Sequence, residues 1–158
     1  MATFYVDTSA LVKVYVAETG HGWMRALCLP RTGNAISTSQ LASIEVEVAL
    51  YRKAQERSIN EADRDKCVTA FRRHILKRYS VVPISDDVCR GARRYVHVAG
   101  LPHPLRTYDA LHLASAQIIS DTLATLGTPS LIFVAADRRL IAIAQYLGFA
   151  TDNPEDHP

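Results

Sequence analysis

Cysteine is scarce in this chain, and no two cysteines form a CxxC pair. The 158 residues include three cysteines, Cys28, Cys67 and Cys89, an odd number at wide spacing. This pattern excludes a disulfide framework and a cysteine-based zinc site. The six histidines show no HExxH motif or comparable ligand spacing. We therefore expect the cysteines to be reduced thiols in the core.

A long apolar run and a basic N-terminal region are also missing. The opening residues MATFYVDTSA reach Asp7 after a very short apolar run, and no segment approaches the roughly 18 apolar residues of a membrane span. The net charge is only +2, so composition alone does not indicate a nucleic-acid-binding protein. We expect a cytoplasmic protein that does not contact a membrane.

The balance of residue types is that of one compact domain. Hydrophobic residues make up 48% of the chain and charged residues 22%, with no low-complexity tract and no internal repeat. A chain of this length can bury a sizeable core without a second domain. We assign residues 1–150 to the domain and residues 151–158, TDNPEDHP, to a C-terminal tail.

Strand and helix signals alternate along the domain. Short apolar runs predict strands at residues 3–6, 35–38, 80–83 and 130–135 and near residue 150. Apolar spacing, capping residues and glycine or proline stops predict helices at residues 10–18, 23–28, 39–57, 61–77, 85–99 and 108–126, and from residue 137 to residue 148. The alternation predicts an α/β fold, a three-layer α/β/α sandwich around a central, mostly parallel sheet of four or five strands.

Three acidic residues stand where strands end or helices begin. Asp7 closes the apolar run FYV, Asp137 closes LIFVAA, and Asp109 opens ALHLASAQII. Because strand ends and helix starts converge on one edge of an open α/β sheet, these carboxylates can meet there. Oxygen ligands without cysteine or histidine favour a hard ion, Mg²⁺ or Mn²⁺. The chemistry that fits such a site is phosphodiester hydrolysis.

Two alternatives stay open on the residues alone. Aspartate is a favoured N-cap that stabilises a helix start by about 0.3–1 kcal/mol, which can explain Asp7, Asp109 and Asp137. Glu45 lies well inside the helix predicted at 39–57, so capping cannot explain it, but its neighbour Glu47 is an equal candidate by helical periodicity. His112 is most simply a core histidine with a hydrogen-bond partner.

Four blocks of the sequence resemble a known family in their order and spacing. They read FYVDTSALVKVYVAE, TSQLASIEVEVAL, LRTYDALHLASA and FVAADRRLIAIAQYLGF, and together they span about residues 3–149. The chain resembles PIN-domain ribonucleases, most closely the VapC toxins of bacterial toxin–antitoxin pairs. Each block alone is weak, since DTSAL occurs by chance, but four blocks in order are specific.

The resemblance implies a site of four carboxylates in a single PIN-like domain. Carried over residue by residue, these are Asp7, Glu45, Asp109 and Asp137, all catalytic and all metal-binding, and the alignment prefers Glu45 to Glu47. Asp7 and Asp109 are the principal ligands of Mg²⁺, with Mn²⁺ as the alternative ion. The hydroxyl of Ser9 supports the site.

The implied activity is that of a Mg²⁺-dependent endoribonuclease. It would cleave RNA with a metal-activated water and inhibit translation until a VapB-type antitoxin neutralises it. Arg138 and Arg139 adjoin Asp137 and are the expected RNA contacts. Residues 9–28 and 40–77 are the expected docking surfaces for the antitoxin, and homodimerisation is usual in the family.

Competing functions are distinguished by single positions. Family members often carry threonine where this chain has Ala135, which leaves as an alternative a PIN fold that binds RNA or a partner with weak or no nuclease activity. Phosphatases of the haloacid dehalogenase type need a second aspartate where Ser9 stands. Receiver-like signalling domains need paired acids at the first strand and a late lysine, and the sequence has neither.

Overall fold

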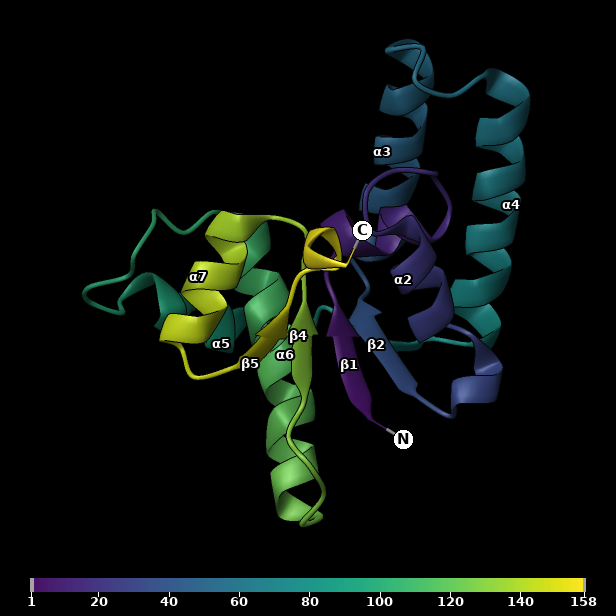
Figure 1. Ribbon diagram of the computed structural model, residues 1–158. Helices are drawn as coiled ribbons and strands as arrows, with labels where there is room; N and C mark the ends of the chain where they lie inside the picture. The colour runs from purple at the N-terminus through teal and green to yellow at the C-terminus, as the bar shows by residue number, and fades with distance from the viewer. Residues whose placement is uncertain (1, 158) are drawn as a thin grey trace.

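The central sheet has five parallel strands. The computed structural model describes residues 2–157, and its strands follow the order β3-β2-β1-β4-β5, with all four pairings parallel (Figure 1). Their bounds are β1 Thr3–Val6, β2 Ala35–Ser39, β3 Ser80–Val82, β4 Ile132–Val134 and β5 Ala150–Asp152. The predicted α/β fold with a parallel sheet is confirmed.

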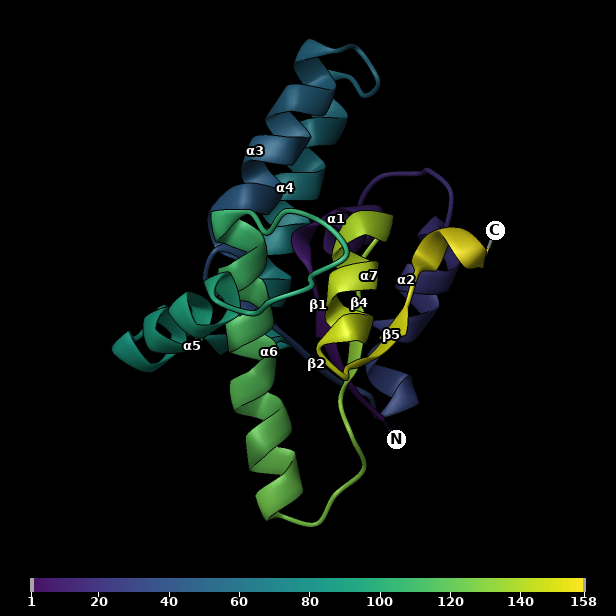
Figure 2. The ribbon, with the colours of Figure 1, turned by 90° about the vertical axis from the view of Figure 1, so that its left-hand side faces the viewer.

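Helices follow the strands in the alternation that the sequence predicts. They are α1 Thr8–Leu11, α2 His21–Leu27, α3 Ala42–Gln55, α4 Glu61–Lys77, α5 Asp86–Val96, α6 Thr107–Thr125 and α7 Arg138–Tyr146, with 3₁₀ turns η1 Val12–Val14, η2 Pro30–Thr32 and η3 Pro154–Asp156. Figures 1 and 2 both show the α3–α4 hairpin projecting beyond one end of the sheet and α6 beyond the other. Across residues 2–157, no helix combines the length and the apolar character needed to traverse a bilayer.

The alternation of side chains along β1 divides the core between two faces of the sheet. Phe4 and Val6 pack in one cluster with residues of α2, α3 and α4, and Tyr5 packs in a second cluster with residues of α6 and α7. Neighbouring side chains of a strand point to opposite faces, so β1 contributes to both clusters. The helices therefore form one layer on each side of the sheet, and the predicted three-layer sandwich is confirmed.

The first helix is shorter than the predicted 10–18. It begins at Thr8, directly after its N-cap Asp7, and gives way to the 3₁₀ turn η1 at Val12. The valines of this segment are β-branched, which restricts their side-chain rotamers and lowers helix propensity. The first helix therefore positions the residues after Asp7 but does not continue to Glu18.

Helix α3 begins three residues later than the predicted residue 39, and this moves Glu45 into its first turn. The delay arises because β2 runs through Ser39 and the Gln40 N–H still bonds to the carbonyl of Val82. The buried face of α3 consists of small or medium apolar residues, Ala42, Val46 and Leu50. A second apolar stripe of the same helix, formed by Ile44, Val48 and Tyr51, is exposed.

The segment expected to be a tail belongs to the fold. Strand β5 includes Thr151 and Asp152, because these residues pair with β4, and η3 follows it. Gly20, with φ +83°, packs so closely on this segment that an added Cβ would lie 2.3 Å from the carbonyl oxygen of Pro154. The rings of Trp23 and His157 stack with centroids 4.3 Å apart. The C-terminal residues thus cover α2.

Candidate active site

Asp7 leaves β1 at the edge where the β4 segment also ends. Its backbone N–H bonds to the carbonyl of Val134 at 2.9 Å, because β1 and β4 pair in register. Its Oδ2 accepts hydrogen bonds from the N–H and the hydroxyl of Ser9, at 2.9 and 2.6 Å. The Ser9 hydroxyl in turn accepts the N–H of Ala136 at 2.9 Å. Ser9 therefore joins Asp7 to the segment that leads into Asp137.

Asp109 and Asp137 share one cation of the chain. A terminal nitrogen of Arg139 lies 2.5 Å from Asp109 Oδ2 and 3.3 Å from Asp137 Oδ2. A second nitrogen of the same guanidinium donates to the carbonyl of Pro104 at 2.9 Å. Arg139 was predicted to contact RNA, but in this structure its side chain neutralises two of the four acids.

Glu45 and Asp7 share one partner, the imidazole ring of His112. Glu45 Oε2 lies 2.8 Å from His112 Nε2 and accepts the hydroxyl of Thr8 at 2.6 Å. His112 Nε2 also lies 3.6 Å from Asp7 Oδ1. Glu47, the rival of Glu45, pairs with Arg72 of α4 through two hydrogen bonds of 2.7 Å. Geometry therefore joins Glu45, and not Glu47, to Asp7.

The charged forms of Glu45 and His112 stabilise each other. Burial lowers the pKa of His112, but the carboxylates of Asp7 and Glu45 outweigh burial and raise it above its ordinary value. Burial raises the pKa of Glu45, yet hydrogen bonds from His112 and Thr8 lower it below its ordinary value. The ionised carboxylate and the protonated ring are thus both favoured at this position.

Asp7 and Asp137 each cap a helix and also belong to the candidate site. Asp7 caps α1 with Oδ2, and Asp137 caps α7 with Oδ1, which accepts the N–H groups of Arg139 and Leu140. The second carboxylate oxygen of each residue faces another side chain, the ring of His112 for Asp7 and the guanidinium of Arg139 for Asp137. One oxygen therefore serves the helix while the other serves the site.

The four carboxylates are ligands that suit a hard divalent ion, but their side chains do not surround a common position. Within the described part of the chain, no three His, Cys, Asp or Glu side chains form a group that could hold a metal ion. The quartet consists of two pairs, one on the ring of His112 and one on the guanidinium of Arg139. Because Asp109 and Asp137 already bind the guanidinium of Arg139, this edge stabilises positive charge, and carboxylate oxygens are the ligands that Mg²⁺ and Mn²⁺ prefer.

Two other predicted positions lie at the margin of the site. Ala135 is fully buried in the cluster with Phe133, and its N–H bonds to the carbonyl of Asp152 at 3.2 Å. Arg138 is exposed and pairs with Asp156 at 2.7 Å. Arg138 is therefore the member of the arginine pair whose side chain reaches solvent.

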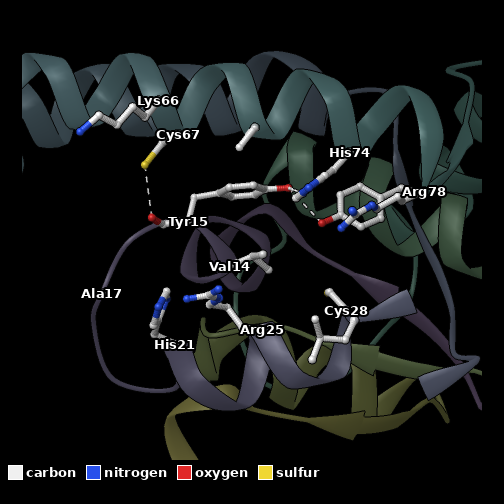
Figure 3. Close-up of a pocket in the computed structure, with 13 residues that line it drawn as sticks. Val14, Tyr15, Ala17, His21, Arg25, Cys28, Lys66, Cys67, His74 and Arg78 are labelled. Carbon is white, nitrogen blue, oxygen red and sulfur yellow. Dashed lines mark hydrogen bonds between the residues drawn. The ribbon is translucent and has the colours of Figure 1, made fainter. Parts of the chain in front are cut away.

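A hollow of the molecule lies apart from the four acids. A cavity of about 660 Å³ lies between α2 and α4, and none of the four acids lines it. Figure 3 shows Tyr15 crossing it, with a hydroxyl that bonds to His74 at 3.0 Å and to Tyr79 at 2.9 Å. The cysteines are free and half-buried, and two of them line this cavity, where burial raises the pKa of Cys28 to about 12.

Two residues that complete the site were not assigned to it from the sequence, Thr8 and His112, which both bind Glu45. Arg139 was expected to contact RNA, but its partners are Asp109 and Asp137. A signal for His112 was available, because it follows Asp109 by three residues, which is the spacing of one helical face. The partners of Arg139 depend on the path of the loop before α6 and could not be read from spacing.

Comparison with known proteins gives consistent matches along almost the whole chain. The family model described as "PIN domain" matches residues 4–146. Ribonuclease VapC46 of Mycobacterium tuberculosis (strain ATCC 25618 / H37Rv) is 33% identical over 156 residues, which cover 98% of this chain and 99% of the relative. Ribonuclease VapC47 of M. tuberculosis (strain CDC 1551 / Oshkosh) is 28% identical over 95% of this chain and 96% of its own length.

Solved structures share the fold at lower sequence identity. FitAcB from Neisseria gonorrhoeae superposes with a TM-score of 0.63 at 16% identity, covering 96% of this chain and 97% of that chain. VapC20 of M. tuberculosis, a toxin that cleaves the sarcin–ricin loop, has a TM-score of 0.60 at 17% identity, with 93% and 96% covered. These similarities extend over the same sheet and helix layers that position the four acids.

Proposed function

Because this chain belongs to the PIN domain family and to its VapC ribonucleases, we propose that it is a metal-dependent endoribonuclease. In this role it is the toxin of a toxin–antitoxin pair and inhibits translation in the cytoplasm until a VapB-type antitoxin neutralises it. The observation that supports the proposal is that four acids from separate segments form two pairs, Asp7 with Glu45 at His112 and Asp109 with Asp137 at Arg139. The ribonuclease names of the relatives support it.

The carboxylates would hold Mg²⁺, with Mn²⁺ as the alternative. Asp7 and Asp109, the two most buried acids, are the proposed principal ligands, and Glu45 and Asp137 bind a second ion or orient water. A divalent ion here would lower the pKa of water and offset the negative charge that develops on the phosphoryl group. Water attacks phosphorus in line, and hydrolysis leaves a 5′-phosphate and a 3′-hydroxyl.

The side chains of the protein set the geometry for this chemistry. Ser9 fixes the orientation of the Asp7 carboxylate through two hydrogen bonds to Oδ2. Thr8 and His112 hold Glu45 through Oε2. The guanidinium of Arg139 contacts Oδ2 of both Asp109 and Asp137, so Arg139 would have to release these oxygens before they could bind a divalent ion.

Removal of divalent ions is expected to abolish RNA cleavage. Without a divalent ion, the site would have no group to lower the pKa of water or to offset the charge that develops on the phosphoryl group. Cleavage of a single-stranded RNA should fall to background in excess EDTA and return when excess Mg²⁺ or Mn²⁺ is added. Undiminished cleavage in excess EDTA would exclude the metal mechanism. An absence of cleavage under every condition would favour a PIN fold that binds RNA or a partner without cleaving RNA.

RNA contacts are proposed at the start of α7. Arg138 is exposed and close in sequence to Asp137, so it can meet the phosphate backbone after leaving Asp156. Arg139 lies closer to the acids and is proposed to contact the backbone near the scissile bond once it leaves Asp109. Homodimerisation remains a prediction from the family resemblance.

The cavity between α2 and α4 is the proposed docking place of the antitoxin. It lies between the two segments, 9–28 and 40–77, that were expected to receive this partner. Its lining is apolar with basic groups and contains no carboxylate among the described residues, the basic members being His21, Arg25, Lys66, His74 and Arg78. Such a surface favours an apolar segment that carries acidic side chains.

Reversing charge in this cavity is expected to weaken the antitoxin complex. The double variant Arg25→Glu and Arg78→Glu should raise the dissociation constant at least about tenfold, because like charges then face each other across the interface. Titration calorimetry at two salt concentrations measures the effect, which should shrink at high salt. Arg90→Glu on α5, outside the cavity, is the control. Equal affinities of all three proteins would exclude this docking surface.

A further inference from the structure

His112 is buried although its ring is polar on both sides. Only 2% of the residue is exposed, and each ring nitrogen has a partner. Nδ1 lies 2.8 Å from the hydroxyl oxygen of Tyr5, and Nε2 lies 2.8 Å from Oε2 of Glu45. A core histidine needs satisfied nitrogens, but one of these partners is a proposed catalytic carboxylate. The ring therefore connects the core of the protein to its site.

The direction of the hydrogen bond to Glu45 follows from the chemistry of the partners. An ionised carboxylate only accepts hydrogen bonds, so Nε2 must carry the hydrogen. The Tyr5 hydroxyl can either donate or accept and therefore fits Nδ1 with or without a proton. His112 consequently donates to Glu45 in both of these protonation states of its ring.

The far end of this chain of hydrogen bonds is rigid. Tyr5 is fully buried in β1, two residues before Asp7, and its ring stacks on Phe133 with centroids 5.4 Å apart and an interplanar angle of 12°. Its place is set by the sheet and by close packing. The Tyr5 hydroxyl therefore fixes the orientation of the His112 ring.

Only one of the two Glu45 oxygens is engaged. Oε2 receives both the hydroxyl of Thr8 and the N–H of His112, whereas within residues 2–157 no hydrogen bond is made to Oε1. Donors on one oxygen fix the plane of the carboxylate and leave the other oxygen for a ligand. Groups in this second layer tune metal sites in this way, by orienting the residues that touch the ion.

We propose that His112, supported by Tyr5, is a positioning residue that holds Glu45 beside Asp7 and leaves Oε1 of Glu45 to a divalent cation. This inference rests on the proposed metal-dependent function and assigns it a residue that does not touch the ion. It also explains why the β1 segment, α3 and α6, which are distant in sequence, meet at the imidazole of His112. The simpler alternative is that His112 only fills space in the core.

Two substitutions of similar polarity separate these explanations. The side-chain amide of His112→Gln reaches the position of Nε2 and can still donate to Glu45, whereas that of His112→Asn ends near Nδ1 and cannot reach it. We expect His112→Asn to weaken Mn²⁺ binding by about 10- to 100-fold, and His112→Gln to stay within about threefold of the wild type. Titration calorimetry of the metal-free protein with Mn²⁺ gives the affinities.

Two further variants complete the test. Leu113→Ala, on the same helix and fully buried, should lower the melting temperature without changing Mn²⁺ affinity. Tyr5→Phe keeps the stacked ring but loses the hydroxyl, so its Mn²⁺ affinity should fall between those of the Gln and Asn variants. If His112→Asn does not fold, the comparison of Tyr5→Phe and His112→Gln with the wild type decides the question.

The outcomes distinguish this inference from the proposed function. Equal Mn²⁺ affinities of the wild type, the His112 variants and Tyr5→Phe would overturn the role of His112 while leaving metal-dependent cleavage intact. A parallel loss of affinity in Leu113→Ala would also overturn it, because general destabilisation would then explain the effect. A wild type that binds no Mn²⁺ and cleaves RNA in EDTA would instead remove the proposed function, and the positioning role with it.

Discussion

Replacing Asp109 with asparagine is expected to lower the rate of RNA cleavage by more than about 100-fold, because even residues that only support metal ligands often cost 10- to 100-fold. The Asp109 carboxylate is nearly buried and is a proposed principal ligand. Asparagine keeps the shape and one acceptor oxygen, so the N–H of Arg106, which now donates to Asp109 at 3.2 Å, retains a partner. Asp7→Asn should have an effect of the same size.

The control for this experiment lies on the same helix. Asp121 is an exposed residue of α6 whose carboxylate accepts a hydrogen bond from Gln117 at 2.7 Å. Asp121→Asn makes the same chemical change away from the site and should cleave a single-stranded RNA at the wild-type rate. Thermal unfolding checks that all variants fold. Full activity in Asp109→Asn would remove this residue from the proposed site.

The largest effect on stability is expected from Phe133→Ala, about 3–5 kcal/mol of the free energy of unfolding. Phe133 is fully buried in β4 and stacks on Tyr5. Truncation to alanine leaves a cavity at the centre of the sheet, which neighbouring strands cannot close without losing their register. It also removes the support of Tyr5.

Urea unfolding measures this prediction, and Phe149→Ala is the comparison. Phe149 packs on Phe133 with centroids 5.8 Å apart but is only partly buried, so its truncation should cost clearly less. The dependence of the free energy on urea should keep its slope in both variants, since the surface exposed on unfolding changes little. Equal losses from the two truncations would contradict the central place assigned to Phe133.

Much of the fold was predictable because its periodicities are strong. Short apolar runs bounded by capping residues mark each strand, and their alternation with helices indicates a parallel sheet. Element ends were less predictable where tertiary contacts decide them. The bond from Gln40 to Val82 delays α3, and the pairing of β5 with β4 recruits Thr151 and Asp152 from the expected tail.

The candidate site was predictable in its acids but not in their partners. Position at strand ends suggested Asp7 and Asp137, and the family resemblance assigned Glu45, which periodicity could not separate from Glu47. The exposed stripe of α3 shows why periodicity failed, since Ile44 and Val48 lie away from the core although they are large and apolar. Which cation meets which carboxylate depends on distances between segments, and a linear sequence does not contain them.

The position of β4 in the sheet has a consequence for protein synthesis. β1 lies between β2 and β4, but a ribosome makes β1 and β2 long before Ile132–Val134. Until then one edge of β1 exposes unpaired backbone groups, which can pair with other chains. Asp137 is synthesised just after β4, the strand that pairs with this edge of β1. A nascent chain that stalls earlier therefore lacks one of the four carboxylates and is open to aggregation and degradation, so interrupted translation would yield no active nuclease.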